Sequence, residues 1–174
     1  MDTPFYYYDT ALLQSTLDAI RSEIAQYPNY HVHYAMKANA NPLLLKIIQQ
    51  AGFGADCVSG GEVQTAIDAG FSTDKIVYAG VGKSDREILL ALQQNIFCFN
   101  VESIPELEVI NELAAKEHTV ANVCLRINPD TFSHLAFYPG HLLYQTVNVF
   151  SFSPGVSADI NHIHVFPIQN AADN

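Results

Sequence analysis

The stretch Tyr34-Ala35-Met36-Lys37-Ala38-Asn39-Ala40-Asn41-Pro42 sets the pattern that the rest of the chain repeats. Before the lysine, side chains alternate in kind, with Val32, Tyr34 and Met36 on one side of the chain. A period of two residues predicts a β-strand. The asparagines and the proline that follow Lys37 predict a turn. Lys37 is therefore expected at the carboxyl end of a strand, on the side that carries small or polar residues.

Two interpretations of Lys37 are open from its position alone. Charged residues usually lie at the surface, so the lysine can simply mark where a strand meets water. Alternatively, a lysine in a partly dry site can act as a nucleophile and form a Schiff base with an aldehyde cofactor. Position alone favours the first interpretation.

Strand-like and helical segments alternate outward from this stretch. The predicted strands are Val32–Met36, Gly54–Val58, Ile76–Ala79, Ile96–Val101 and Val123–Ile127, with a short aromatic strand at Phe5–Tyr8 before them. The predicted helices are one after Asp9 and Thr10, then Leu43–Ala51, Glu62–Ala69, Asp85–Gln94 and Ile104–Lys116. Strands that alternate with helices of this length predict βα units and a parallel sheet.

The pattern favours a barrel among the α/β folds. No G-x-G-x-x-G motif follows any predicted strand, which disfavours a dinucleotide-binding sheet. A complete (β/α) barrel needs about 250 residues, and about 200 at the least. The chain has 174 residues. We therefore expect a partial, truncated barrel of five or six units.

Bulk composition excludes several kinds of partner. The formal net charge is −10, which disfavours nucleic acids and anionic membrane surfaces. The amino terminus lacks the features of a signal peptide, and no apolar run approaches the ~20 residues of a spanning helix. The three cysteines, Cys57, Cys98 and Cys124, are widely spaced, as expected of reduced thiols in a cytoplasmic protein.

The chain changes character near residue 130. All 8 Lys and Arg residues lie at or before Arg126, and no Lys, Arg or Glu follows it. We therefore divide the chain into a barrel domain at 1–130 and a divergent, irregular tail at 131–174. Within the tail, His162–Phe166 can form a strand. Its His-x-His pair lacks a third ligand, so no metal site is predicted.

In a parallel βα fold, working residues lie at the carboxyl ends of the strands. That position is occupied by polar or glycine residues, namely Lys37, Asn39, Asp56, Ser59, Gly60, Gly61, Glu62, Gly80, Gly82, Lys83, Asn100, Glu102, Ser103 and Arg126. Exposed loops are polar anyway, and Ser103 can be a helix cap. Arg126 is less easily explained, because it is predicted inside a strand and its charge needs an anionic partner. Asp56 is an available one.

Four blocks at these strand ends resemble diaminopimelate decarboxylases. They are Tyr34–Asn39, the run Gly-Ala-Asp-Cys-Val-Ser-Gly-Gly-Glu at Gly54–Glu62, Asn100–Ser103 and Leu125–Pro129. The wider group contains barrel-type pyridoxal-phosphate-dependent ornithine and arginine decarboxylases and alanine racemases. The resemblance covers about residues 4–130, and the second block is the one most typical of the diaminopimelate branch. It implies a TIM-like barrel of the alanine racemase type.

The resemblance also implies a chemistry. Lys37 is similar to the lysine that holds pyridoxal phosphate as a Schiff base. The substrate would be a small amino acid, meso-diaminopimelate, which loses its α-carboxylate as carbon dioxide and becomes L-lysine, with the pyridine ring accepting the electrons. Asp56, Ser59, Glu62 and Arg126 correspond to cofactor-binding residues, with Asp56 and Arg126 interpreted as a pair that orders the site and Glu62 in support. Full-length members of the family are homodimers.

Residues 131–174 depart from the family pattern. The resemblance implies further blocks there: a histidine-rich turn, a stacking histidine, a glycine-rich phosphate loop, an acid for the pyridine nitrogen and a second β-rich domain. None matches, as expected if a frameshift had joined unrelated sequence to a truncated enzyme. Two alternatives to decarboxylation therefore stay open: a non-catalytic pyridoxal-phosphate-binding or regulatory relative, and a non-functional fragment.

Overall fold

A single sheet organises the part of the chain that the structure describes. The computed structural model describes residues 4–27 and 29–126, together with the backbone of a strand at 148–152. The strands are β1 (His33–Ala35), β2 (Gly54–Cys57), β3 (Ile76–Tyr78), β4 (Cys98–Val101), β5 (Ala121–Leu125) and β6 (Asn148–Phe152). The helices are α1 (Thr10–Ile24), α2 (Pro42–Gln50), α3 (Gly60–Asp68), α4 (Asp85–Gln93) and α5 (Ile104–Lys116). None of these helices is long and apolar enough to span a bilayer.

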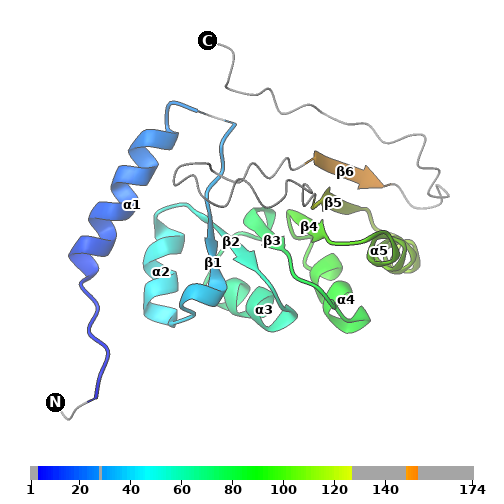
Figure 1. Ribbon diagram of the computed structural model, residues 1–174, viewed down its shortest axis with the longest axis horizontal. Helices are drawn as coiled ribbons and strands as arrows, with labels where there is room; N and C mark the ends of the chain where they lie inside the picture. The colour runs from blue at the N-terminus through cyan, green and yellow to red at the C-terminus, as the bar shows by residue number, and fades with distance from the viewer. Residues whose placement is uncertain (1–3, 28, 127–147, 153–174) are drawn as a thin grey trace, which may run out of the picture.

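The strands lie in the sheet in the same order as in the sequence. Strands β1 to β5 are all parallel, and β6 pairs antiparallel with β5 (Figure 1). A doubly wound sheet reverses its strand order at a switch point, whereas consecutive parallel strands are the arrangement of a (β/α) barrel. The prediction of an α/β fold with a partial barrel is confirmed.

Strands β2 to β5 send alternate side chains to the two faces of the sheet, where two different clusters of residues lie. The helix-side core contains Ala55 and Cys57 of β2 together with buried residues of α1 to α5, such as Leu45 and Val63. The opposite face holds a smaller cluster of Val77, Cys98 and Cys124, with Phe97 packed against it. Asp56 lies between Ala55 and Cys57 and pairs in register with Val77, so its side chain belongs to this second face. The second face is the one that points inward when such a sheet closes into a barrel.

Helix starts follow directly from the local sequence. Asp9 accepts hydrogen bonds from the N–H groups of Ala11 and Leu12 and so begins α1. Asn41 begins α2 in the same way, with Pro42 as the first helical residue. These caps explain why the predicted helices and the observed ones begin at nearly the same residues.

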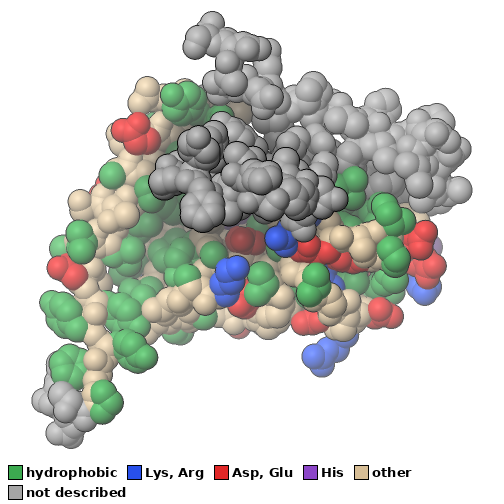
Figure 2. All heavy atoms as spheres, viewed as in Figure 1, with side chains coloured by type: hydrophobic (Ala, Val, Ile, Leu, Met, Phe, Trp, Pro, Cys, Tyr) green, Lys and Arg blue, Asp and Glu red, His purple; other side chains and the backbone are tan. Residues whose placement is uncertain are grey.

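Three local predictions for the described residues differ from the structure. Phe5–Tyr8 is not a strand; these residues form an irregular segment before α1, and their aromatic side chains are exposed (Figure 2). The chain leaves β1 after Ala35, and Met36–Ala38 form a turn of 3₁₀-helix instead. Strand β5 ends at Leu125, so Arg126 follows the strand rather than lying inside it, although its N–H still donates to the carbonyl of Val101. The predicted strand at His162–Phe166 lies outside the described residues.

Candidate functional site

The predicted site residues gather at the end of the sheet where the parallel strands have their carboxyl ends, which we call the carboxyl edge. Lys37 follows the carboxyl end of β1, and Asp56 is the residue before the last in β2. Ser59 and Glu62 lie at the start of α3, just after β2, and Arg126 follows the end of β5. Because β1, β2 and β5 are parallel, all five residues lie at the edge where these strands end, as predicted.

A braced turn presents the Lys37 side chain to solvent. Met36 is fully buried, whereas the neighbouring Lys37 is exposed. The Tyr34 hydroxyl donates to the carbonyl of Asn39 (3.1 Å), and the Asn39 side chain accepts from the N–H of Asn41 (2.9 Å) and donates to the hydroxyl of Tyr8 (3.1 Å). Within the described residues, the Lys37 amine makes no hydrogen bond or ion pair. These hydrogen bonds fix the backbone around Lys37 and leave its side chain at the surface.

Asp56 supplies a partly buried carboxyl group close to that amine. Its Oδ1 is buried and has no hydrogen-bond partner among the described residues. Burial raises the pKa of Asp56, the nearby His33 and Lys37 side chains act to lower it, and the Glu62 carboxylate raises it further. A buried oxygen without a partner is costly in an isolated chain and suits a site where a bound group supplies the missing donor.

Arg126 pairs with Glu102 instead of Asp56. Its Nη1 donates to both carboxylate oxygens of Glu102, at 2.9 and 3.2 Å. Glu102 directly follows β4, and Arg126 directly follows the neighbouring strand β5, so the two side chains meet at the same edge. The predicted pairing of Asp56 with Arg126 is therefore wrong. The Arg126 side chain is 41% exposed, so it has surface left for a further anionic group.

Ser59 and Glu62 hold the start of α3. The Ser59 hydroxyl accepts from the N–H of Glu62 (3.2 Å), and Glu62 Oε2 accepts from the N–H of Val58 (2.8 Å). Ser59 is thus the N-cap of α3, and Glu62 reaches back one residue further, to the N–H before the N-cap. This arrangement fixes the loop that follows Asp56 and places the amino end of a helix at the same edge as Lys37.

A second lysine at this edge has the opposite environment. The Lys83 side chain is 1% exposed, and its Nζ donates to the carbonyls of Gly80 (2.8 Å) and Asn100 (3.0 Å) and to the carboxylate of Glu106 (2.5 Å). The other carboxylate oxygen of Glu106 accepts from the N–H of Glu102 (3.0 Å). All three N–H donors of the ammonium group are used in hydrogen bonds, so the Lys83 nitrogen is a structural donor and not a nucleophile. Its hydrogen bonds link the carboxyl ends of β3 and β4 to the start of α5.

Sequence reasoning named Lys83 but missed its partner Glu106 and the related Glu87. Glu87 accepts from the N–H and hydroxyl of Ser84 and from the N–H of Gly60, which joins the starts of α4 and α3. A signal was present in the repeated spacing Ser-x-x-Glu. It occurs three times, at Ser59–Glu62, Ser84–Glu87 and Ser103–Glu106, each time at the start of a helix.

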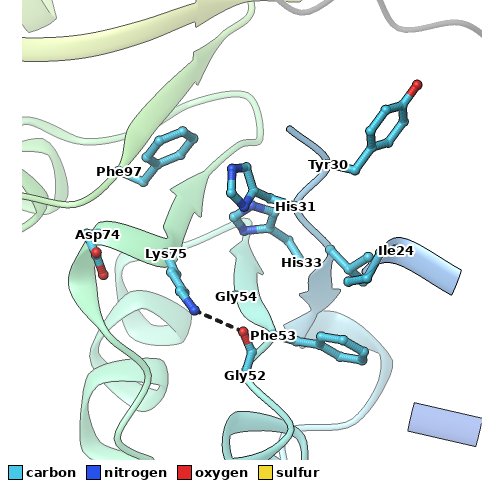
Figure 3. A pocket seen from close by; sticks show the side chains of 11 residues that line it. Ile24, Tyr30, His31, His33, Gly52, Phe53, Gly54, Asp74, Lys75 and Phe97 are labelled. Atoms are coloured by element: carbon cyan, nitrogen blue, oxygen red, sulfur yellow. Dashed lines mark hydrogen bonds between the residues drawn. The ribbon is translucent and has the colours of Figure 1, made fainter. Parts of the chain in front are cut away.

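A cavity of about 180 Å³ lies at the other edge of the sheet, away from Lys37. The rings of His31 and His33 lie side by side in it, Phe97 stacks near His33, and Lys75 donates to the carbonyl of Gly52 (Figure 3). Burial is the main reason that the pKa of His33 is lowered, which favours a neutral ring. The cavity is formed at the amino ends of the strands, where βα folds keep structural residues.

Comparisons with known proteins agree with the geometry of the carboxyl edge. Residues 13–140 match the profile of the family described as "Pyridoxal-dependent decarboxylase, pyridoxal binding domain". A diaminopimelate decarboxylase of Bacteroides thetaiotaomicron is 65% identical over 134 residues, which are 77% of this chain and 35% of that protein. One from Aquifex aeolicus is 44% identical over 128 residues, which are 74% of this chain and 30% of that protein.

A solved structure gives the same result. The crystal structure of diaminopimelate decarboxylase from Helicobacter pylori complexed with L-lysine matches with a TM-score of 0.70 and 40% sequence identity. The match covers 74% of this chain and 32% of that one. The chain thus spans about a third of the length of the relatives that it matches.

Proposed function

The chain belongs to the family of pyridoxal-dependent decarboxylases, and we propose that its carboxyl edge serves the decarboxylation of meso-diaminopimelate to L-lysine. The observation that carries this proposal is the exposed amine of Lys37 beside the buried Oδ1 of Asp56, neither of which has a hydrogen-bond partner in the part of the chain that the structure describes. An amine without a partner and a carboxyl group without a donor fit a cofactor that brings an aldehyde and a polar ring.

Each proposed site residue has a separate task. Pyridoxal phosphate, when bound, supplies an electron sink through its ring. Lys37 would hold the aldehyde carbon, and Asp56 would accept a hydrogen bond or place negative charge next to the Lys37 nitrogen. Arg126, kept in place by Glu102, would orient an anionic group of the cofactor or of the small amino-acid substrate. Ser59 and Glu62 would line the cofactor while they fix the start of α3.

A second candidate is a protein that binds pyridoxal phosphate without turnover. It is favoured by the span of the chain, about a third of the length of its relatives. A non-functional fragment is the corresponding extreme. Both candidates share the proposed cytoplasmic location, which the three unpaired cysteines favour.

Chemical trapping separates these candidates. The whole chain is incubated with pyridoxal phosphate, reduced with borohydride, digested and analysed by mass spectrometry, while carbon dioxide release from meso-diaminopimelate is measured in parallel. The proposal predicts a pyridoxyl group on Lys37 and release of carbon dioxide, both absent in Lys37→Ala. A label on Lys37 without carbon dioxide supports the second candidate.

The matched control is Lys46→Ala, because Lys46 is an exposed lysine on α2 outside the site. This variant should keep both the label on Lys37 and the release of carbon dioxide. A label spread evenly over Lys37, Lys46 and other exposed lysines would refute a specific cofactor site at this edge.

A further inference from the structure

Two cysteines lie in contact on the face of the sheet opposite the helices. Cys98 of β4 and Cys124 of β5 are 1% and 2% exposed, and their sulfur atoms are 3.4 Å apart. Val77 and Phe97 pack against them. The remaining cysteine, Cys57, is buried in the other core, on the helix side of the sheet. The chain therefore has one thiol pair and one solitary thiol of equal burial.

We propose that Cys98 and Cys124 form a redox-sensitive pair that a hydroperoxide converts into an intramolecular disulfide. The two strands that carry them are hydrogen-bonded neighbours, with Cys124 in register with Asn100. Cys98 is two residues from the direct partner of Cys124, so the two cysteines form a diagonal cross-strand pair on the same face. Their side chains bring the sulfurs into contact. A disulfide needs a sulfur separation of about 2.05 Å, so the sulfurs must approach by about 1.4 Å.

The contact also makes the two thiols chemically unequal. The hydrogen bond between the two sulfurs lowers the pKa of Cys124, against an opposing effect of burial. The same hydrogen bond, together with burial, raises the pKa of Cys98. A thiolate is the form that attacks an oxidant, so the direction of these shifts favours Cys124 as the attacking sulfur and Cys98 as the resolving one, while the sulfur contact itself allows either order.

The reaction balances with a hydroperoxide as the oxidant. The Cys124 thiolate attacks the peroxide oxygen, the O–O bond breaks, and the leaving oxygen takes a proton to give an alcohol, or water when the oxidant is hydrogen peroxide. Sulfur is thereby oxidised to a sulfenic acid. The sulfur of Cys98 then attacks the sulfur of Cys124, the S–O bond breaks, and hydroxide leaves as water with the proton of Cys98. Two thiols and one hydroperoxide give one disulfide, one alcohol or water, and one further water.

The pair lies on the two strands that lead to an ion pair of the carboxyl edge, with Cys98 as the first residue of β4 and Cys124 as the residue before the last in β5. Strand β4 leads to Glu102 and β5 leads to Arg126. A disulfide would link β4 covalently to β5 on the amino-terminal side of that ion pair. The inference concerns the thiols alone and does not depend on the proposed decarboxylation.

The test is a thiol map of the folded, reduced chain after treatment with hydrogen peroxide. Remaining thiols are alkylated in denaturant, and tryptic peptides are analysed by mass spectrometry. Lys75 and Lys116 are cleavage sites that separate the three cysteines. The expected result is the loss of two of the three alkylatable thiols, a cross-linked peptide that joins Cys98 to Cys124, an alkylated Cys57, and full recovery with dithiothreitol.

Two variants and one reference state complete the experiment. Cys57→Ala should lose both remaining thiols as the unchanged chain does, whereas Cys124→Ser should form no cross-link. The same chain is also oxidised in urea, where it is unfolded and Cys57 can join any cross-link. This sample gives the pattern of cross-links that is expected when the fold does not select the pair. Three intact thiols in the folded chain, or a folded pattern equal to that in urea, overturns the proposal.

Discussion

Lys37 and Lys83 lie at the same edge of the sheet in opposite environments. The Lys37 amine is exposed and has no partner among the described residues, whereas the Lys83 ammonium is buried and bound by two carbonyls and the carboxylate of Glu106. Tyr78 adds its ring face at 5.3 Å from the Lys83 nitrogen. The difference teaches that burial alone does not identify a reactive lysine. A buried ammonium with three acceptors has a structural role, whereas the exposed Lys37 is the one to which we assign the chemistry.

The largest expected change in the free energy of unfolding follows from removing the Lys83 ammonium group. Lys83→Met should lower the free energy of unfolding by about 3 kcal/mol, because it leaves the Glu106 carboxylate and two carbonyls without their donor. Lys37→Met should change it by less than about 0.5 kcal/mol, since an exposed side chain without partners is removed. Urea unfolding of both variants measures the two values.

A double variant sharpens this comparison. Lys83→Met combined with Glu106→Leu should recover part of the loss, because no buried charge is then left alone. Equal destabilisation by Lys37→Met and Lys83→Met would show that the two lysines have similar environments, against the structure.

The next effect concerns two neighbouring glycines of the carboxyl edge. A Cβ at Gly60 would lie 2.5 Å from Cγ and 2.9 Å from Cβ of Glu87, whereas a Cβ at Gly61 would only reach the Ser59 hydroxyl at 3.8 Å. Gly60→Ala should therefore cost about 2 kcal/mol through overpacking. Gly61→Ala should be neutral or gain up to about 0.5 kcal/mol, because the unfolded chain loses freedom. Thermal unfolding of the two variants, side by side, tests whether α3 and α4 are as close as described.

Two carboxyl groups at this edge should give opposite responses to pH. Burial raises the pKa of Asp56, so the folded protein keeps a proton that the unfolded chain has released, and this contribution to stability falls as pH rises above the ordinary Asp pKa. Hydrogen bonds from the Ser84 side chain and the Gly60 and Ser84 N–H groups lower the pKa of Glu87. Its contribution is present at neutral pH and is lost as pH falls through the lowered pKa.

Substitution separates the two contributions. Asp56→Asn should be more stable than the unchanged chain at neutral pH and closer to it in acid. Glu87→Gln should be less stable at neutral pH and should approach the unchanged chain in acid. Urea midpoints measured from acidic to neutral pH give both profiles, and parallel profiles for the two variants would contradict the assigned environments.

The smallest effect is expected from the ion pair of Glu102 and Arg126. Glu102→Gln should cost less than about 1 kcal/mol, because the Arg126 side chain is 41% exposed and water screens the charges. The loss should shrink further in high salt. A loss as large as that of Lys83→Met would show that this pair is buried and structural, which would weaken its proposed role with an anionic ligand.

The sequence was sufficient to predict the order and edges of the βα units. Alternating or continuous apolar runs mark every one of the five parallel strands, and capping residues mark the helices. The helix predicted at Ile104–Lys116 is observed with the same bounds, because Ser103 caps its start. The prediction failed for Phe5–Tyr8, where aromatic residues of high β-propensity have no neighbouring strand in the described chain.

The ion-pair partners of Arg126 and Lys83 could not be predicted from the sequence. Arg126 has several acidic residues at the same edge, and the choice of Glu102 over Asp56 depends on where β4 and β5 end relative to each other. The bond between Lys83 and Glu106 joins residues that lie 23 positions apart. The repeated Ser-x-x-Glu spacing identifies the glutamates as helix-start residues, yet only the folded edge shows which backbone and side-chain groups they reach.

The strand order has a consequence for how the protein is made. His33 pairs with Gly54, Ala55 with Ile76 and Val77 with Cys98, so each of the first three strands meets a neighbour 21 residues further along. Such short separations mean low contact order and allow the sheet to grow from its first strand during synthesis. On the ribosome, Lys37 and Asp56 can meet as soon as β2 has emerged. The Glu102–Arg126 ion pair and the Cys98–Cys124 contact must wait for β5, so the nascent chain completes the Lys37 and Asp56 side of this edge before the side that carries Arg126.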